Sequence, residues 1–285
     1  MILIKRDDTI PFAFGGNKVR KLRYLIPQVL TSGADTVVTC GGVQSNHARA
    51  TAAACAASGL ACHIVVNGVE PAAPTGNALL NRHLGATFEY VANREDRKPA
   101  MDRAFARLHR AGRRPAIVPL GASTPHGALG YLAAVAELVA QGIVPDVIVH
   151  ACSSGGTSAG ILAGCQLHGL ATRVIGISAD DPPAAVNAEI QAIVAGMEDL
   201  LGLDRGALSV SVEIDDQLVG TGYGEPTPAS IEAQSLAART EAIFVDHTYT
   251  AKALAGLIAY CRDGRIPATA TVLFWHTGGQ VALFA

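Results

Sequence analysis

Residues 36–47 read Thr-Val-Val-Thr-Cys-Gly-Gly-Val-Gln-Ser-Asn-His, and this stretch decides the fold. Its first four residues are all β-branched and predict a short buried strand, because such side chains pack well on a pleated surface. The two glycines predict a tight turn, and the polar residues after them start an Ala-rich helical segment. A strand, a turn and a helix in direct succession form the unit from which parallel sheets are built.

The same alternation continues along the chain. Apolar runs bounded by Gly, Pro or Asp predict eight strands, near residues 36–39, 63–66, 87–91, 116–119, 146–150, 173–177, 242–245 and 271–275. Helical segments are expected near 18–30, 45–57, 74–84, 98–111, 126–140, 157–168, 228–240 and 250–263. We therefore predict an α/β fold with two open doubly wound parallel sheets, which the turn signals fit better than one closed eight-stranded barrel.

Composition narrows the class of protein. The chain has 285 residues, of which 49% are hydrophobic and 16% charged, so it is expected to form one or two domains with large cores. A net charge of −2 argues against nucleic acid or an anionic membrane as a partner. The six cysteines lack the spacing of a metal site or a disulfide framework, and no signal segment is recognised. We expect a cytoplasmic protein without a metal.

The segment Ser-Ser-Gly-Gly-Thr at residues 153–157 follows one predicted strand and begins a helix. Glycines expose backbone N–H groups, hydroxyls add donors, and the helix N-terminus adds partial positive charge, so the segment suits a phosphate. It lacks both the Gly-Lys-Ser/Thr of a nucleotide-binding P-loop and a dinucleotide fingerprint with an acidic ribose ligand. A single phosphate monoester is the preferred ligand, a nicotinamide dehydrogenase is disfavoured, and a ligand-free tight turn is the alternative.

Lys18 follows Gly-Gly-Asn at the start of a predicted helix, where a cation is unfavourable for stability. A lysine combined with a phosphate cradle suggests a Schiff base to pyridoxal phosphate, whereas a solvated surface lysine is the alternative. Gln44, Ser45, Asn46 and His47 begin the next helix, and one of them is expected to cap it. Four consecutive polar side chains exceed what a cap requires, so we expect them to bind an amino-acid carboxylate and the phenolic oxygen of the cofactor.

Several segments together resemble a known family. They are FGGNK (14–18), GGVQSNHARATAAA (41–54), PLGASTPHGALGY (119–131), SSGGTSAG (153–160), GYGEP (222–226), TYTAKALAGLI (248–258) and FWHTGG (274–279). Their order resembles that in the pyridoxal-phosphate enzymes that comprise D-cysteine desulfhydrase and 1-aminocyclopropane-1-carboxylate (ACC) deaminase. These enzymes belong to the fold-type II group, which is similar to the tryptophan synthase β subunit.

The resemblance implies roles for individual residues. Lys18 matches the Schiff-base lysine, which also moves protons at the substrate Cα. The other cofactor ligands implied are Asn46 at the ring oxygen O3′, the loop residues Ser153, Ser154, Gly155, Gly156 and Thr157 at the phosphate, and Thr277 beside the pyridine nitrogen. Ser45, His47 and Gln44 are expected at the substrate, and Tyr223 and Tyr249 match active-site tyrosines.

The resemblance also implies an arrangement of domains. A large cofactor-binding domain would comprise residues 1–19 and 131–285, a small domain would comprise residues 20–130, and the active site would lie in the cleft between them. A homodimer is the expected assembly.

The preferred activity is α,β-elimination from a small amino acid, with D-cysteine as the leading substrate and pyruvate, sulfide and ammonia as products. ACC deaminases of this family carry Glu after the tyrosine and Leu in the HxGG segment, whereas this chain has Thr250 and Thr277 at those positions. The alternatives are ACC deaminase, a specialised biosynthetic relative, and a non-catalytic ligand-binding homologue.

Overall fold

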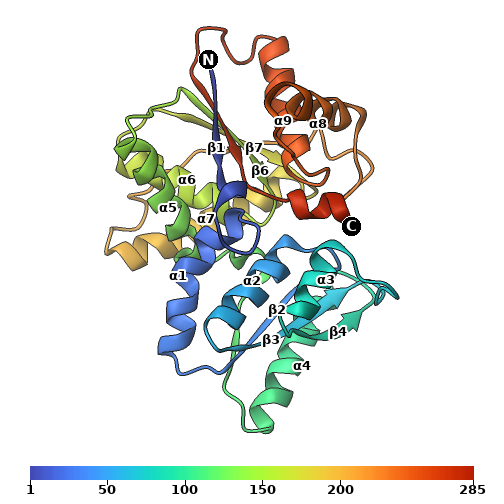
Figure 1. The fold of residues 1–285 in the computed structure, drawn as a ribbon. Coiled ribbons are helices and arrows are strands. Elements are labelled where there is room, and N and C mark those ends of the chain that lie inside the picture. Colours follow the sequence, from blue (N-terminus) through green and yellow to red (C-terminus); the bar gives the residue numbers. More distant parts are fainter.

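The computed structural model describes residues 1–285 and contains two open sheets, in which every strand pairing is parallel (Figure 1). The large sheet has the strand order β1 (Ile2–Arg6), β9 (Val272–His276), β6 (Val147–Cys152), β7 (Arg173–Ser178) and β8 (Glu213–Asp215). The small sheet has the order β4 (Thr87–Val91), β3 (Ala61–Asn67), β2 (Thr36–Gly42) and β5 (Pro115–Ile117). The predicted fold class is confirmed.

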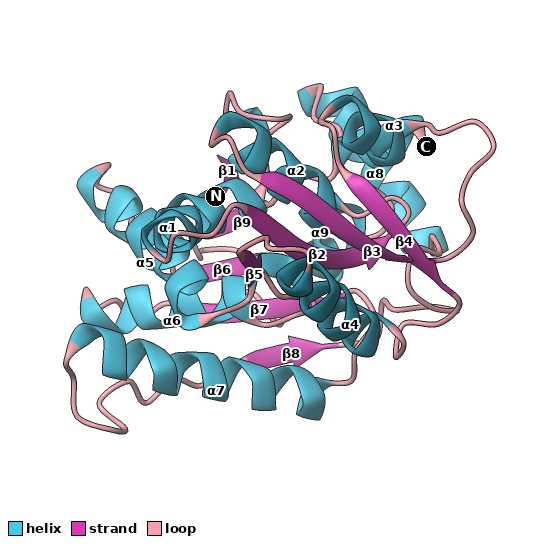
Figure 2. Cartoon of the chain, turned by 90° about the horizontal axis from the view of Figure 1, so that it is seen from below, coloured by secondary structure: helices cyan, strands magenta, loops and turns pink.

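Nine α-helices surround these strands (Figure 2). They are α1 (Asn17–Thr31), α2 (Asn46–Ala57), α3 (Gly76–His83), α4 (Arg97–Arg110), α5 (Pro125–Ala140), α6 (Gly156–Leu167), α7 (Pro183–Leu201), α8 (Pro228–Glu241) and α9 (Thr250–Arg262). Short 3₁₀ segments lie at Asp7–Thr9, Leu120–Ala122 and Gln280–Phe284. None of the helices combines the length and the apolar character needed to cross a membrane.

Both sheets are covered on both faces, as alternating side chains show. In β6, Ile148 packs in a core with α5, α6 and α7, while its neighbour Val149 packs in a second core with α8 and α9. In β2, Val37 packs with α1 and α2, while Val38 faces α4. Since successive strand residues point to opposite faces, a continuous apolar run is what a doubly covered strand requires.

Four local expectations differ from the structure. The strands β1 and β8 and the helix α7 were not predicted, and residues 242–245 form no strand. In that last segment Ile243 and Val245 are buried beside α8 and α9, but no neighbouring strand pairs with them. Apolar alternation reports burial, and it does not by itself supply a partner for the backbone. Conversely, β1 is a strand because the distant β9 pairs with it.

The two Gly-rich loops described above occupy equivalent places in the two sheets. In the large sheet, β6 lies between β9 and β7, and in the small sheet β2 lies between β3 and β5. The chain therefore changes direction across the sheet at β6 and at β2, and the loops that follow these strands lie at the switch points. Ligands of open parallel sheets bind at such points, beyond the carboxyl ends of the strands.

The division into a large domain (residues 1–19 and 131–285) and a small domain (residues 20–130) stays a proposal. Its second boundary falls inside α5, where Ala128 and Tyr131 both pack in one core of the large sheet. A boundary before Pro125 follows the limits of the elements better.

Candidate functional site

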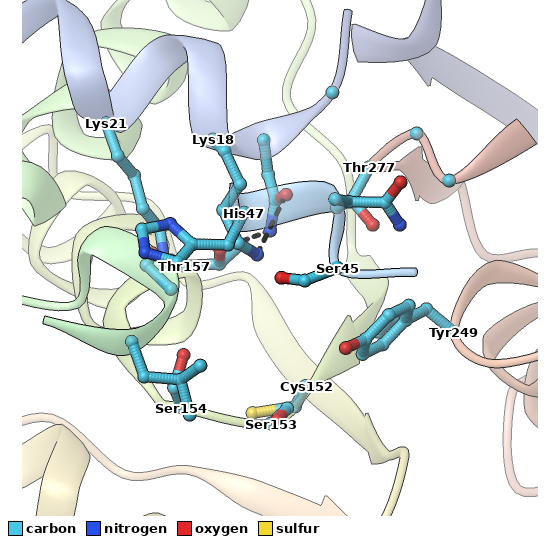
Figure 3. A pocket seen from close by; sticks show the side chains of 18 of the residues that line it. Lys18, Lys21, Ser45, His47, Cys152, Ser153, Ser154, Thr157, Tyr249 and Thr277 are labelled. Carbon is cyan, nitrogen blue, oxygen red and sulfur yellow. Dashed lines mark hydrogen bonds between the residues drawn. The ribbon is translucent and has the colours of Figure 1, made fainter. Parts of the chain in front are cut away.

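One cavity brings most of the predicted residues together. Its empty space is about 1010 Å³, including its opening to solvent. It is lined by eleven of the thirteen predicted site residues, namely Lys18, Ser45, Asn46, His47, Ser153, Ser154, Gly155, Thr157, Tyr223, Tyr249 and Thr277. Figure 3 shows Lys18 and Lys21 extending from one helix toward this space, with Ser153 and Ser154 opposite and Tyr249 on a third side.

The two remaining residues, Gln44 and Gly156, do not line the cavity. The amide of Gln44 accepts a hydrogen bond from Asn77 N (2.8 Å) and donates one to Thr75 O (3.2 Å), so it holds the start of α3. The residues that line the cavity do not include Gln44, and its expected contact with the substrate stays a prediction. Gly156 also lies off the cavity surface, where a Cβ would come within 3.0 Å of Lys21 Nζ.

Lys18 is the second residue of α1, and its backbone is anchored through its neighbour. Asn17 N donates to Thr277 O (2.9 Å), and Lys18 Nζ donates to Asn17 Oδ1 (3.1 Å). Burial is the main cause that lowers the pKa of the Lys18 amine to about 8, and the nearby Arg49 cation adds to it. An amine with this pKa is partly neutral near neutral pH, as a nucleophile or a base must be.

The anion loop (residues 153–157) connects β6 to α6. Gly155 has φ of 74°, a left-handed conformation that glycine adopts without steric cost, and it precedes the first residue of α6. Thr157 Oγ1 accepts a hydrogen bond from Asn17 Nδ2 (3.1 Å), which joins the lysine segment to this loop. The N-terminus of α6 therefore faces the cavity with partial positive charge beside the lysine.

Lys21 was not predicted, although it belongs to the same cluster. Its side chain is only 1% exposed, and Nζ donates to Gly121 O (3.2 Å) and Ser123 Oγ (3.1 Å). Ser123 Oγ in turn lies 2.8 Å from Ser154 Oγ in the anion loop. Burial and the Lys18 charge lower the pKa of Lys21. Its spacing of three residues from Lys18 places both on one helix face, a signal present in the sequence.

Ser45 and His47 are positioned by the start of α2. Ser45 is the N-cap, since its Oγ accepts from Ala48 N (3.2 Å), and a Cβ at Gly41 would lie 2.4 Å from that oxygen. His47 pairs with Thr39 Oγ1 at 2.8 Å. Burial holds the pKa of His47 well below its usual value, and Lys18 and Lys21 lower it further. His47 therefore lines the cavity as a neutral ring.

Tyr249 and Tyr223 are joined by a hydrogen bond between their hydroxyls, at the side of the cavity opposite α1. Burial raises the pKa of Tyr249 well above 10, and proximity to Tyr223 raises it further. Asp246, which was not predicted, is fully buried and accepts from Tyr249 N (2.9 Å) and Thr250 N (3.0 Å). Thr250 Oγ1 also donates to Asp246 Oδ1 (2.7 Å), so Thr250 supports the start of α9 and does not line the cavity.

The charge of the cavity wall has one sign. Five cationic side chains line it, and no Asp or Glu does; the cations are Lys18, Lys21, Arg49, Arg94 and Arg97. No group of three or more His, Cys, Asp or Glu side chains is placed to hold a metal ion. An anionic organic ligand that reacts with an amine fits this wall.

Comparison with known proteins identifies relatives along the whole chain. The family model described as "Pyridoxal-phosphate dependent enzyme" matches residues 1–278. A protein of Methylobacterium sp. (strain 4-46) named 1-aminocyclopropane-1-carboxylate deaminase is 38% identical in an alignment 292 positions long, which covers 98% of this chain and 87% of that protein. A protein of the same name from Methylobacterium nodulans is 37% identical with the same coverage.

Solved structures agree with this assignment. A crystal structure described as an ACC deaminase homologue superposes with a TM-score of 0.92 at 33% sequence identity, covering 99% of this chain and 86% of that chain. O-ureido-L-serine synthase superposes with a TM-score of 0.70 at 16% identity, over 99% of this chain and 85% of that chain, and shows the fold alone.

The residues of the cavity fit pyridoxal phosphate. The Lys18 amine of lowered pKa suits its aldehyde, and the glycine-rich anion loop in a wall without Asp or Glu suits its phosphate.

Proposed function

Because the chain belongs to the family of pyridoxal-phosphate-dependent enzymes, we propose that it is a lyase that deaminates a small amino acid. The observation that carries the proposal is the Lys18 amine, whose pKa is about 8, in an acid-free cavity that also contains the anion loop. When bound, pyridoxal phosphate supplies an electron sink for the charge that develops at the substrate Cα.

The protein would hold both ends of the cofactor, its phosphate and its aldehyde. The anion loop and the helix N-terminus behind it would bind the phosphate, with the buried Lys21 amine close to the same loop. Lys18 would hold the cofactor covalently through its amine. Thr277 lines the cavity and is 6% exposed, and its carbonyl also fixes Asn17, so it is the proposed neighbour of the pyridine nitrogen.

Lys18 Nζ is the proposed base and acid at the substrate carbon. Once free, an amine with a pKa near 8 can remove a proton and return it at neutral pH. Ser45 Oγ accepts one hydrogen bond from the backbone of α2, so its own proton is available to the substrate carboxylate. The neutral Tyr249 hydroxyl can relay a proton from the other side of the cavity.

Deamination of ACC is the first candidate reaction. It adds one water to ACC, opens the ring and releases 2-oxobutanoate and ammonia. The relative named ACC deaminase, at 38% identity over nearly the whole chain, supports this candidate. Thr250 and Thr277 instead favour β-elimination from D-cysteine.

β-Elimination from D-cysteine is the second candidate. It releases pyruvate, sulfide and ammonia with the uptake of one water. Thr277 supports it, because a hydroxyl lines the cavity where the resemblance places Leu in ACC deaminases.

The homodimer and the cytoplasmic location stay predictions.

A substrate screen tests the proposal and separates the two candidates. Purified protein saturated with pyridoxal phosphate is incubated with ACC, D-cysteine, L-cysteine and D-alanine, and keto acid, ammonia and sulfide are measured. We expect keto acid and ammonia in equal amounts from ACC or D-cysteine, and none with Lys18→Ala. A protein that binds the cofactor at Lys18 but releases ammonia from no small amino acid would show that the lyase proposal is wrong.

A further inference from the structure

Arg49 is a buried cation that has no acidic partner. It lies on α2, its side chain is 2% exposed, and it forms no ion pair with any carboxylate. Burial lowers the pKa of its guanidinium to about 10. A buried charge without a counter-charge is costly, so an arginine among the alanines of this helix calls for a functional reason.

The hydrogen bonds of Arg49 connect three segments of the chain. Nη2 donates to Gly15 O (3.1 Å), which lies three residues before Lys18. Nη1 donates to Asn46 Oδ1 (3.2 Å) and to Asn77 Oδ1 (3.0 Å). Nε is enclosed and has no acceptor, so a ligand cannot reach the guanidinium there. Protein acceptors hold both Nη groups, so the guanidinium has a fixed position beside the cavity, which it also lines.

Asn46 is the neighbour that faces the cavity. Its Oδ1 accepts two hydrogen bonds, one from Arg49 Nη1 and one from Asn77 Nδ2 (2.9 Å). These two donors determine the orientation of the Asn46 amide. If the amide were flipped, its NH₂ group would face two other donors and form no hydrogen bond with them. The Asn46 Nδ2 group then has no acceptor in the protein, and Asn46 lines the cavity. The arrangement presents an N–H donor, polarised by a cation, to the ligand.

The charge of Arg49 also acts on Lys18. Arg49 is the main charged group that opposes protonation of the Lys18 amine, whereas Asp246 and the Cys152 sulfur act in the opposite direction. Burial raises the pKa of the Cys152 thiol, so that group carries little charge near neutral pH. Lys18 also acts on His47, which is held neutral, and on Lys21, one helical turn along α1. The other titratable groups of the cavity wall are Arg94, Arg97, Tyr223 and Tyr249.

We propose that Arg49 is a positioning residue that turns the Asn46 amide into a hydrogen-bond donor toward bound pyridoxal phosphate and whose charge favours the neutral Lys18 amine. The proposal depends on the proposed function only for the identity of the ligand, and its tests use no substrate. A negative substrate screen would therefore leave them unaffected.

The first test measures the Lys18 amine in the cofactor-free protein. Short pulses of acetic anhydride are given across a range of pH, and acetylation of the Lys18 peptide is measured by mass spectrometry, with Nα-acetyl-lysine as the internal standard. We expect a midpoint near pH 8 in the original protein. Arg49→Gln should raise the midpoint by on the order of 1 unit, whereas Arg49→Lys, which keeps the charge, should leave it nearly unchanged. An unchanged midpoint in folded Arg49→Gln would overturn the electrostatic part.

The second test is a double-mutant cycle on cofactor affinity, measured by fluorescence titration of the cofactor-free protein. We expect Arg49→Gln to weaken binding of pyridoxal phosphate about tenfold, because the Asn46 amide loses its charge-assisted hydrogen bond from Arg49. In an Asn46→Ala background the same change should have little further effect, because the two residues act through one amide. Additive effects would overturn the positioning role. If Arg49→Gln does not fold, Arg49→Lys enters the same cycle, since it keeps the charge but loses the planar fork.

Discussion

Asn17 Nδ2 donates a hydrogen bond of 3.1 Å to Thr157 Oγ1, across a separation of 140 residues in the sequence. Asn17 Oδ1 at the same time accepts from Lys18 Nζ (3.1 Å). One side chain thus connects the reactive amine with the first turn of α6. This contact joins the two ends of the proposed cofactor site.

Thr157→Val should therefore weaken cofactor binding. The change removes the acceptor of Asn17 and a hydroxyl donor from the anion loop, and a hydrogen bond to a charged group contributes about 1.5–3 kcal/mol. Since 1.4 kcal/mol corresponds to a factor of ten, the Kd of pyridoxal phosphate should rise about tenfold or more. Equilibrium titration of the cofactor-free protein measures this, with Thr157→Ser as the control that keeps the hydroxyl. Equal affinity of the valine and serine variants would place the phosphate elsewhere.

Lys18 should be the residue that carries the cofactor. The two buried lysines are held by backbone carbonyls, Lys21 by Gly121 O (3.2 Å) and Lys252 by Val219 O (2.8 Å). Borohydride reduction of the loaded protein followed by peptide mapping should find the cofactor on Lys18. Lys18→Ala should abolish both the attachment and turnover, and attachment at Lys21 or Lys252 would contradict the assignment.

Thr277 and Thr250 should respond differently to the residues that ACC deaminases carry. Thr277 lines the cavity, so Thr277→Leu should shift the ratio of turnover toward ACC and away from D-cysteine. Thr250 is fully buried and donates to Asp246 Oδ1 (2.7 Å), so Thr250→Glu would place a second carboxylate beside a buried one. We expect a folded Thr277→Leu protein and a strongly destabilised Thr250→Glu protein by thermal unfolding.

Two results would contradict the prediction for Thr250 and Thr277. A Thr250→Glu protein as stable as the original would show that the side chain of residue 250 can turn into the cavity. An unchanged ratio of turnover in Thr277→Leu would remove the argument for D-cysteine from this position.

His150 should make the cofactor-free protein less stable in mild acid. Burial lowers its pKa to about 4, whereas an unfolded histidine titrates near 6.5. Between these values the unfolded chain binds more protons than the folded one, so stability is complete above pH 6.5 and falls as the pH decreases toward 4. His150 alone should account for a loss of about 2 kcal/mol between pH 7 and 5.

Urea unfolding at several pH values measures this effect. His150→Gln cannot titrate and should show a flatter dependence on pH, although other buried histidines such as His47 will retain part of the slope. The exposed His168 serves as the control, and His168→Gln should follow the original protein. An identical slope in the His150→Gln and original proteins would contradict the assignment.

The sequence contained most of the site, and the structure determined how its parts are used. Lys18, the anion loop and the residues after β2 were recognisable because glycines, hydroxyls and a misplaced cation occur next to predicted strand ends. Lys21 and Arg49 were not singled out, although a cation on the face of Lys18 and a lone arginine in an Ala-rich helix were visible. Their importance depends on burial, which a single sequence does not reveal.

By itself the sequence determined the alternation of strands and helices, because periodicity and turn residues act locally. Only the tertiary structure decided the order of the strands, which places the loops after β2 and β6 at the switch points of the two sheets. It also decided that β1 is a strand, that residues 242–245 are not, and that the Gln44 amide is bonded to the start of α3. The physical reason is the same in each case: strand pairing and hydrogen-bond satisfaction depend on partners that are distant in the sequence and close only in the folded chain.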